Sequence, residues 1–445
     1  MLTLLLAGGG LFFAGCRGVS TPAEKIARHD FAAVTEKYRP RNLPVALPKL
    51  TADSSLSNLV VFALLNSLPV AAAYYDWAAA VENITVARSL PDPQITFQSD
   101  IADIVTSVMP GFLQTFPGPG KLKVRARAAG AASEAKYVAF AIVAQQAAFN
   151  LQRAYFQLGQ LAEQLRLQRE IFALLENQER VLRAKNLTGA ASLPEVLRTQ
   201  SERERLRTEI ANLEAALPAR RENFKAALGL SPAQAAPPVP SHFEFSAGNF
   251  DADALEKFAL AHNPQLAAMA ADVRAAEAGI AVAYKERVPD FNLGLMADVK
   301  ASPVFFRPLA GLTLPIWRDK LAAEIAQAQA NKLAAQARWQ AAEIDLAVSF
   351  AEKLLAVRET QRKLALLENE LLPKARQSLE IMRASYQTGA MDFANLTDAE
   401  RIILDLQLET VAARTERELA LAELSLTVAG VPPAGATFLR EPHQP

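Results

Sequence analysis

Residues able to do chemistry are few in this sequence and stand apart from one another. The chain has one cysteine and six methionines, too few soft ligands to hold or relay a soft metal ion. Its histidines have no partners at the spacing of metal ligands; they are His29, His242, His262 and His443. Acidic pairs on the expected helices are typical of solvated faces and of ion pairs between helices. We therefore expect no catalytic site, no metal site, no cofactor and no enzyme activity.

The amino-terminal residues indicate export from the cytoplasm. Residues 2–13 form an apolar run of twelve residues ending in Phe-Ala-Gly-Cys16, too short for a membrane-spanning helix, which needs ~20. Small residues before a cleavage point are typical of a secretion signal, so we interpret residues 1–15 as a signal peptide. Cys16, directly behind Ala14-Gly15, resembles the lipobox cysteine of bacterial lipoproteins, which would carry palmitate as a lipid anchor. The alternative is an ordinary signal peptide with an incidental cysteine.

Two stretches of the chain carry the same motif. Residues 183–193 and 383–393 share Arg, Ala, Thr, Gly and Ala at identical spacing. Glycine adopts a positive φ at a helix end without steric strain, so Gly189 and Gly389 predict turns between antiparallel helices. Ser192 and Asp392 then stand where helix N-caps belong. The chain is therefore predicted to contain two copies of a helical hairpin, each with one defined tip.

The elements on both sides of these tips are predicted from periodicity and from prolines. The expected organisation is an amino-terminal arm (16–55), a first repeat (56–230), an equatorial linker (231–255), a second repeat (256–430) and a tail (431–445). The repeats are expected to hold short helices at 56–66 and 69–88, β-hairpins at 92–117 and 290–315, long helices at 121–186 and 318–387, tips at 187–193 and 388–392, and return helices at 193–228 and 392–428. The arm carries Pro40, Pro44 and Pro48 and is expected to be extended.

The long helices and the charge balance narrow the class of protein. Apolar residues at three-and-four spacing through 121–186 predict coiled-coil packing, and at 1.5 Å per residue this helix would be ~100 Å long. In the second long helix the apolar stripe runs to Leu371, and Pro373 predicts a kink. The chain has 47 basic and 47 acidic residues, which removes the usual electrostatic basis for binding nucleic acid.

The predicted hairpins have one apolar and one polar face. Phe291, Leu293 and Leu295 alternate with Asn292 and Gly294, while a turn at 109–111 is expected inside the first hairpin. Four strands cannot close a barrel, and an open sheet edge is not tolerated in lipid. If the hairpins are embedded in a membrane, closure requires several copies of the chain.

The order of these features resembles the TolC-type outer-membrane efflux proteins, in particular their lipid-anchored branch. The shared features are the duplicated plan, the Pro-Asp start of the strands (Pro91-Asp92 and Pro289-Asp290), the Leu314-Pro315 exit and the Thr-Gly tips. The resemblance implies a mainly α fold with a small β part. In that fold, a homotrimer builds a twelve-stranded transmembrane β-barrel in the outer membrane of a Gram-negative bacterium and an α-barrel of coiled-coil hairpins in the periplasm. It also implies a passive duct that docks to a periplasmic adaptor protein and an inner-membrane transporter.

The resemblance further implies roles for residues at the tips. The turns that would dock the adaptor contain Thr188, Gly189, Thr388 and Gly389. The residues that would line the closed periplasmic end are Glu195, Tyr386, Met391, Asn395 and Asp398. Among these, Tyr386 matches the gate tyrosine, and Met391 replaces an arginine found there in other members. The alternative is that these residues only cap and solvate helical turns. For the whole chain, the alternative is a lipid-anchored coiled-coil scaffold of the envelope that forms no channel.

Overall fold

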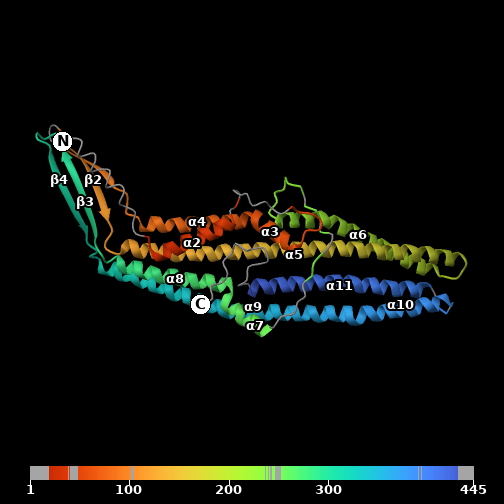
Figure 1. Ribbon diagram of the computed structural model, residues 1–445. Coiled ribbons are helices and arrows are strands. Elements are labelled where there is room, and N and C mark those ends of the chain that lie inside the picture. Colours follow the sequence, from red (N-terminus) through yellow and green to blue (C-terminus); the bar gives the residue numbers. More distant parts are fainter. Residues whose placement is uncertain are drawn as a thin grey trace. The chain divides into compact units, whose positions relative to one another are not determined.

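The described residues form two compact units, each assembled from three stretches of the chain (Figure 1). The computed structural model describes residues 20–38, 40, 49–101, 105–235, 237, 238, 240, 243–245, 252–388, 390, 391 and 393–428. The first unit, here called the sheet unit, takes its described residues from Met1–Tyr38, Ala72–Ile142 and Pro264–Ile344. The second, here called the tip unit, takes them from Arg39–Ala71, Val143–Asn263 and Asp345–Pro445. Each repeat therefore contributes to both units.

The sheet unit contains one four-stranded antiparallel sheet in the order β1-β2-β3-β4 (Figure 1). Its strands are β1 (Gln94–Ile101), β2 (Val105–Phe116), β3 (Asp290–Asp298) and β4 (Phe305–Thr313). The inner pair joins the two repeats, because β2 pairs with β3 from Phe116↔Phe291 to Gly111↔Met296. Within the described residues β1 and β4 are the outer strands, and each has a partner on one side only. The two predicted hairpins are thus confirmed as halves of one sheet.

The turn predicted at residues 109–111 is wrong, because these residues lie inside β2. The chain reverses between Ile101 and Val105, and Pro110 pairs with Phe97 of β1. The register of β2 with β3 begins only at Gly111, so Pro110 stands just outside that pairing, where a missing N–H is tolerated. A Cβ on Gly111 would lie 2.6 Å from Met296 Cγ and 2.7 Å from Thr96 Oγ1. Close packing between strands, and not a turn, is the reason for glycine there.

The predicted extended arm is also corrected, because it contains helix α2 (Pro22–Lys37). Thr21 caps this helix by accepting a hydrogen bond from the Glu24 N–H (3.2 Å), and Pro22 occupies its first turn. The Glu24 side chain is 1% exposed and pairs with Arg88 (2.8 Å) and Arg28 (3.2 Å). The prolines that suggested an extended arm follow this helix, and most of residues 39–48 lie outside the described residues.

Four further helices complete the sheet unit around an aromatic core. They are α4 (Leu68–Arg88), the beginning of α5 (Lys121–Leu187), α8 (Pro264–Lys285) and the beginning of α9 (Arg318–Leu366). Trp77 of α4 is 1% exposed and packs against Phe31 of α2 and against Tyr137 and Phe140 of α5. This cluster packs α2 against α4, which precedes β1, and against α5, which follows β2.

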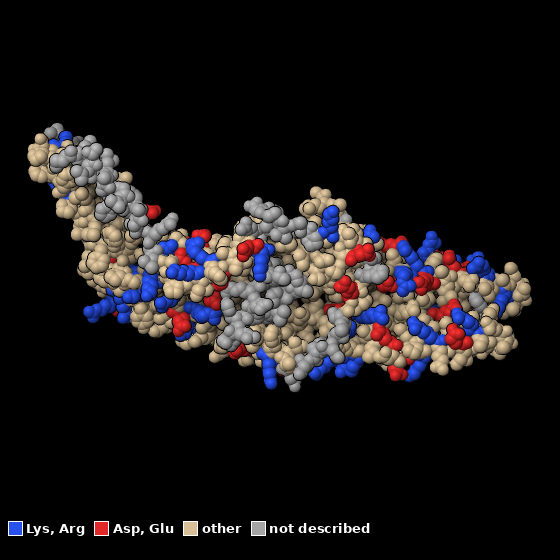
Figure 2. Space-filling model, in the orientation of Figure 1, with Lys and Arg blue, Asp and Glu red and all other residues tan. Residues whose placement is uncertain are grey.

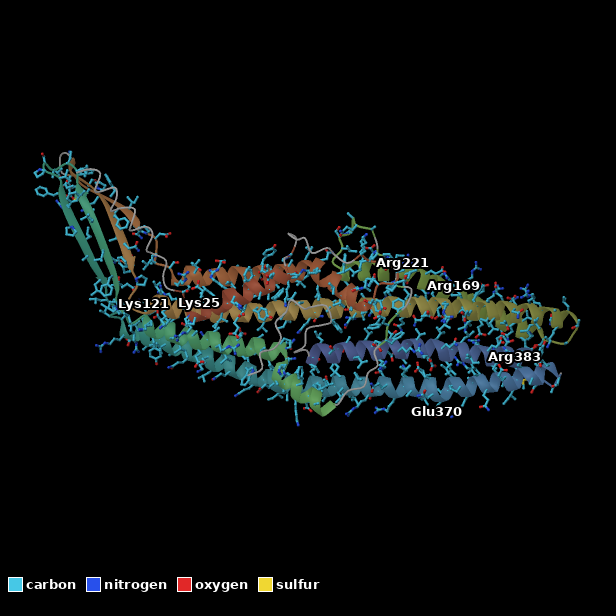
Figure 3. All side chains as sticks on the ribbon, in the orientation of Figure 1. Lys25, Lys121, Arg169, Arg221, Glu370 and Arg383 are labelled. Atoms are coloured by element: carbon cyan, nitrogen blue, oxygen red, sulfur yellow. The ribbon has the colours of Figure 1, made fainter. Side chains whose placement is uncertain are left out.

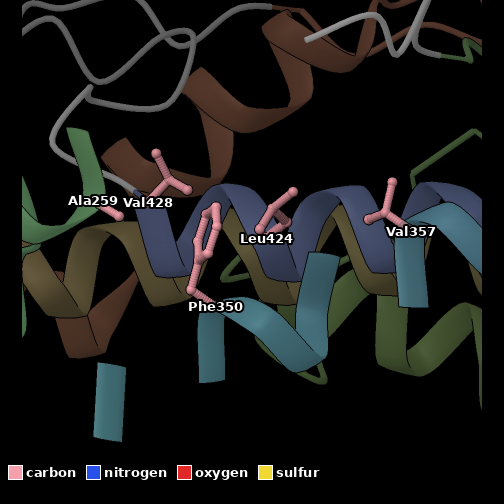
Figure 4. Packing of buried hydrophobic residues seen from close by; sticks show 5 residues of the cluster. All are labelled: Ala259, Phe350, Val357, Leu424 and Val428. Atoms are coloured by element: carbon pink, nitrogen blue, oxygen red, sulfur yellow. The ribbon is translucent and has the colours of Figure 1, made fainter. Parts of the chain in front are cut away.

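The tip unit consists of helices from both repeats packed through apolar side chains. Its other elements are α3 (Leu56–Asn66), α6 (Leu193–Ala227), α7 (Ala252–His262), α10 (Leu372–Gln387) and α11 (Phe393–Val428). Ile171 and Leu175 of α5 and Leu206 of α6 are buried against Leu404 and Leu408 of α11, which joins the two hairpins. A second cluster joins α7, α9 and α11; its buried members are Ala259, Phe350, Val357, Leu424 and Val428 (Figure 4).

The duplication extends to individual hydrogen bonds of the tip unit. The Asn66 side-chain amide donates to the Leu228 carbonyl (3.1 Å), and the Asn263 amide donates to the Thr427 carbonyl (2.6 Å). Each bond ties the end of a short helix to the end of a return helix. Gly229, which follows α6, has φ +75°, and a Cβ there would lie 2.6 Å from the Asn66 carbonyl oxygen. The two repeats therefore share this hydrogen bond as well as the order of their helices and strands.

The second long helix is interrupted by a π-helical turn that ends two residues before Pro373, the proline that predicted its kink. A π-helical turn, η1 (Leu367–Leu371), separates α9 from α10, and Pro373 lies in the first turn of α10. The wider turn accommodates a residue that has no N–H to donate. It also shifts the apolar stripe by one position, because Leu372 is 7% exposed while the predicted Leu371 is 37% exposed.

No single helix among the described residues has both the length and the apolar content needed to cross a membrane. The pair α3 and α4, bent by 52°, meets both criteria together, by length and composition only.

Candidate functional site

One face of the sheet is apolar and exposed. Side chains two residues apart on a strand share a face, and the register aligns these faces across all four strands. This apolar face contains Ile95, Phe97, Pro110, Phe112, Phe116, Phe291, Leu293, Leu295, Ala297, Phe306, Pro308, Ala310 and Leu312, with Ser99 and Gln114 as polar exceptions. Ile95 is 89% exposed and Phe306 68%, so they are left largely uncovered by the part of the chain that the structure describes. Such a continuous apolar surface requires a partner or a membrane.

The opposite face of the sheet is mostly polar. It contains Gln94, Thr96, Gln98, Asp100, Ser107, Thr115, Asn292, Asp298, Arg307 and Thr313, together with Gly111, Gly294 and Gly311, and its apolar exceptions are Met109, Leu113, Met296, Phe305 and Leu309. The Ser107 hydroxyl donates to the Asp100 carboxylate (2.9 Å), and Arg307 lies 3.7 Å from Asp298. A sheet with one apolar and one polar face can separate lipid from water.

An ion-pair cluster joins the repeats where the sheet meets the helices (Figure 3). The Lys121 ammonium, 4% exposed, lies 2.9 Å from the Asp290 carboxylate and 3.1 Å from Glu286, which also pairs with Arg125 (2.9 Å). Asp290 further accepts a hydrogen bond from the Gly118 N–H (2.7 Å). The Pro-Asp start of the second hairpin is thereby fixed to the exit of the first. Sequence reasoning singled out Asp290 but missed Lys121, because a lysine in a long polar helix carries no signal of burial.

The cluster also sets the charge state of Glu286. Burial opposes ionisation of this carboxyl, but the hydrogen bonds and positive charges of Arg125 and Lys121 outweigh burial and lower the pKa of Glu286 below its ordinary value of 4.5. The carboxylate is therefore ionised at neutral pH and holds both cations in place.

The two tips have the same backbone geometry where both are described. Gly189 has φ +76°, which confirms the predicted left-handed turn. The Ala190 N–H donates to the Lys185 carbonyl (2.8 Å), and the Ala390 N–H donates to the Ser385 carbonyl (2.9 Å), at equivalent positions. Thr188 and Thr388 each donate a side-chain hydroxyl to the same carbonyls (2.9 and 3.0 Å), and both are exposed. Gly389, Asp392 and Cys16 lie outside the described residues.

The Glu195 carboxylate is hydrogen-bonded to the N-cap of its own helix. Its carboxylate accepts hydrogen bonds from the Ser192 N–H (2.8 Å) and from the Ser192 hydroxyl (2.9 Å), which forms a capping box at the start of α6. Its role as a cap is thus visible within one chain. Tyr386, at the end of α10, is 41% exposed.

The structure brings three of the predicted tip residues together. Met391, Asn395 and Asp398 line one groove of about 420 Å³ between α10 and α11. Its other walls are formed by Ala375, Ser378, Met382, Ala399 and Ile402. Glu195 and Tyr386 are not among the residues that line this groove.

Sequence reasoning missed a second buried charge, inside the first tip hairpin. The Glu179 side chain is 4% exposed and pairs with Arg203 (2.5 Å) and Arg183 (2.7 Å), and it accepts a hydrogen bond from the Gln200 amide (2.8 Å). An additional ion pair, Glu202 with Arg401, joins this hairpin to α11. Helices rich in Glu and Arg offer many such pairings, so spacing alone does not single out the buried one.

Comparison with known proteins relates this architecture to channels. Residues 256–430 match the sequence model of a family described as outer membrane efflux protein. No curated protein sequence matches the chain. The open-state MtrE outer membrane channel of Neisseria gonorrhoeae is similar, with TM-score 0.71 and 16% identity over 88% of this chain and 96% of that one. The CmeC outer membrane channel of Campylobacter jejuni gives TM-score 0.68 and 14% identity over 89% and 91%. A membrane protein from Pseudomonas aeruginosa gives 0.69 and 20% over 88% and 96%. The predicted family resemblance and the mainly helical fold are confirmed.

Replacing Lys121 with methionine tests the ion-pair cluster. We expect Lys121→Met to destabilise the protein by about 3 kcal/mol at neutral pH, because it leaves two partly buried carboxylates without their shared cation. Because the pKa of Glu286 is lowered in the folded state, its contribution is complete above pH 4.5 and is lost as the pH falls further. The variant should therefore lose less stability than the parent chain below that pH.

Thermal unfolding followed by circular dichroism at several pH values measures both effects. Lys374→Met is the matched control, because Lys374 is 71% exposed and pairs with Glu370 on the surface of one helix. Equal unfolding temperatures for the two variants would contradict a structural role for Lys121.

Proposed function

We propose that this chain belongs to the outer membrane efflux protein family, whose sequence model matches residues 256–430, and that it is the outer-membrane channel of a tripartite efflux system. The observation that carries the proposal is the sheet with one exposed apolar face and one polar face, continuous with long helices. The apolar face would contact lipid, and the polar face would line water. The chain would thus be a passive duct driven by the pump to which it docks.

The proposed assembly is a homotrimer. Each chain supplies four strands with two open edges, so two copies would supply eight strands and three would supply twelve, and only a barrel of more than about eight leaves a water-filled lumen. Pairing of β4 from one copy with β1 of the next would satisfy both edges. All nine residues of β4 are exposed in the single chain, as expected for a strand whose second edge pairs only on assembly.

The proposed lipid anchor agrees with the position of the first described residues. Cys16 lies five positions before Thr21, the cap of α2. Helix α2 is tied through Glu24 to Arg88, the last residue of α4, and β1 begins at Gln94. An acyl chain on Cys16 would therefore start close to the strands that we place in the outer membrane.

The proposed docking and gating sites are the tips. The turns that contain Thr188, Gly189, Thr388 and Gly389 would face a periplasmic adaptor and an inner-membrane transporter. Met391, Asn395 and Asp398 share a groove near the second tip, which supports a common role at the periplasmic constriction.

A lipid-anchored scaffold that forms no channel is the competing function. Such a protein would use the long helices and the anchor but would have no need of an exposed apolar sheet. The apolar face therefore favours the channel.

Paired substitutions on the two faces of β3 test the channel. We expect the purified chain to be a trimer in detergent and to conduct ions in planar bilayers. Leu293→Lys places a charge on the apolar face, which destabilises insertion by ~2–4 kcal/mol at mid-membrane, and should abolish conductance. Asn292→Lys is the matched control, because the neighbouring side chain lies on the polar face, and it should conduct with altered ion selectivity. A monomer without conductance, or equal behaviour of both variants, would favour the scaffold.

Substitutions at the tips test the gate. Tyr386→Phe combined with Glu195→Gln should raise the open fraction of the channel, because a hydrogen bond to a charged group contributes ~1.5–3 kcal/mol and would occur in each of the three copies. Glutamine retains an acceptor for the Ser192 cap, so this choice removes the charge and preserves the capping box. Asp398→Asn should instead reduce the preference for cations.

Single-channel recordings in planar bilayers measure conductance and selectivity. Glu195→Ala is the comparison, because it removes both the charge and the cap. If only the alanine variant differs from the parent chain, Glu195 is a cap and not a gate residue.

Lipidation is tested by metabolic labelling with palmitate. Cys16→Ser should remove the label and leave a chain that still inserts through its strands. A mature protein without an acyl chain at Cys16 would rule out the anchor.

A further inference from the structure

Basic residues are concentrated where the helices meet the sheet (Figure 2). Helix α5 follows β2, α8 precedes β3 and α9 follows β4, so the ends of these three helices lie at the base of the strands. Their cations are Lys121, Lys123, Arg125, Arg127, Lys285, Arg287, Arg318 and Lys320. The carboxylates in the same segments and at the start of β1 are Asp92, Glu286, Asp290 and Asp319. In a chain with no net charge, this region carries a clear positive excess.

Five of these eight cations form no ion pair with a described carboxylate, and one of the five, Lys285, donates instead to the Pro119 carbonyl. Lys123, Arg127, Arg287 and Arg318 are exposed, and none forms an ion pair within the part of the chain that the structure describes. Arg287 does lie over the Tyr284 ring, 5.4 Å from its centre. These four side chains, here called the border cations, are therefore available to an external anion.

Two of the border cations lie at the amino-terminal ends of helices. Lys123 lies in the first turn of α5, which contains no acidic residue, and Arg318 begins α9, whose first turn contains Asp319. The amino-terminal end of a helix carries a partial positive charge, so cations there are repelled. An anion bound at this position would be attracted by the side chains and by both helix ends.

The exposed apolar residues of the sheet end at the base of the strands, where the border cations begin. Phe116 and Phe291, which pair with each other, stand at the base of the apolar face. Beyond β4, Leu314, Ile316 and Trp317 are 59%, 64% and 72% exposed, and Arg318 follows directly. Tryptophan beside arginine or lysine is typical of the boundary between the hydrocarbon core and the headgroups of a membrane.

We propose that the border cations bind the phosphate groups of anionic phospholipids in the leaflet that faces the periplasm. The proposal rests on the proposed membrane location of the sheet. Phosphatidylglycerol and cardiolipin carry a net negative charge, whereas phosphatidylcholine carries none, so the site should discriminate by headgroup. The bound lipid would seal the boundary between the strands and the helices.

Native mass spectrometry of the full-length trimer in detergent measures the binding of phosphatidylglycerol and phosphatidylcholine. We expect phosphatidylglycerol to bind more tightly, and high salt to weaken it. Lys123→Gln, Arg127→Gln, Arg287→Gln and Arg318→Gln together should reduce its affinity by at least about tenfold, because each cation near an anionic surface contributes to attraction. Equal binding of both lipids to the parent trimer would overturn the proposal, independently of how the variant folds.

A matched control removes four exposed cations that form no ion pair within the described residues and lie on α6 and α9. The control substitutions are Arg205→Gln, Arg221→Gln, Arg358→Gln and Arg362→Gln. They should leave phosphatidylglycerol binding unchanged, and an equal loss would overturn the proposal by showing that only net charge matters. Competition by inorganic phosphate at the concentration of the lipid would assign the cations to a soluble anion and also overturn it. Conductance of the parent trimer is also measured in phosphatidylcholine bilayers. If the trimer conducts ions there but binds both lipids equally, the proposed lipid site is wrong and the proposed channel stands.

Discussion

Every backbone N–H and C=O group placed in lipid must be hydrogen-bonded, and this requirement governs the architecture. A single four-stranded sheet leaves two edges open, so the chain alone cannot satisfy it. Duplication supplies two hairpins that pair through β2 and β3, which closes one of the edges of each repeat internally. The remaining edges, β1 and β4, would meet in the proposed assembly. Each strand is connected at one end to a helix, directly or through a short segment.

The junction of Lys121, Glu286 and Asp290 shows how one chain crosses between two environments. Strands have period two and helices have period 3.6, so their side-chain patterns cannot be continued into one another. Here the change occurs over a few residues in both repeats, and a buried ammonium fixes the end of one hairpin to the beginning of the other. The Gly118 N–H, bonded to the same carboxylate, shows that the backbone also takes part.

The sequence predicted elements whose signal is local and missed those that depend on packing. The strand at Asp290–Asp298 and the turn at Gly189 were predictable, because strict alternation indicates a strand and a glycine between two long helical patterns indicates a helix end. The turn expected at Pro110-Gly111 failed because tight strand packing uses the same residue types. Among the tip residues, family resemblance grouped Glu195 with Asp398, whereas the structure places Asp398 in a groove and Glu195 in a local cap. The Ser192-x-x-Glu195 spacing is itself the signature of a capping box, so this local role could have been read from the sequence.

The π-helical turn at Leu367–Leu371 allows the second hairpin to hold one additional residue without losing its packing. Each residue of an α-helix rotates the next side chain by about 100°, so one additional residue in a regular helix would turn every side chain that follows. The wider turn absorbs that residue, and Leu372 lies in the core where a regular helix would place Leu371. Loss of one residue within this turn would therefore restore a regular helix and keep the packed face of α10 toward α11. The same loss at the beginning of α10 would turn that face away and require the hairpin to be rebuilt.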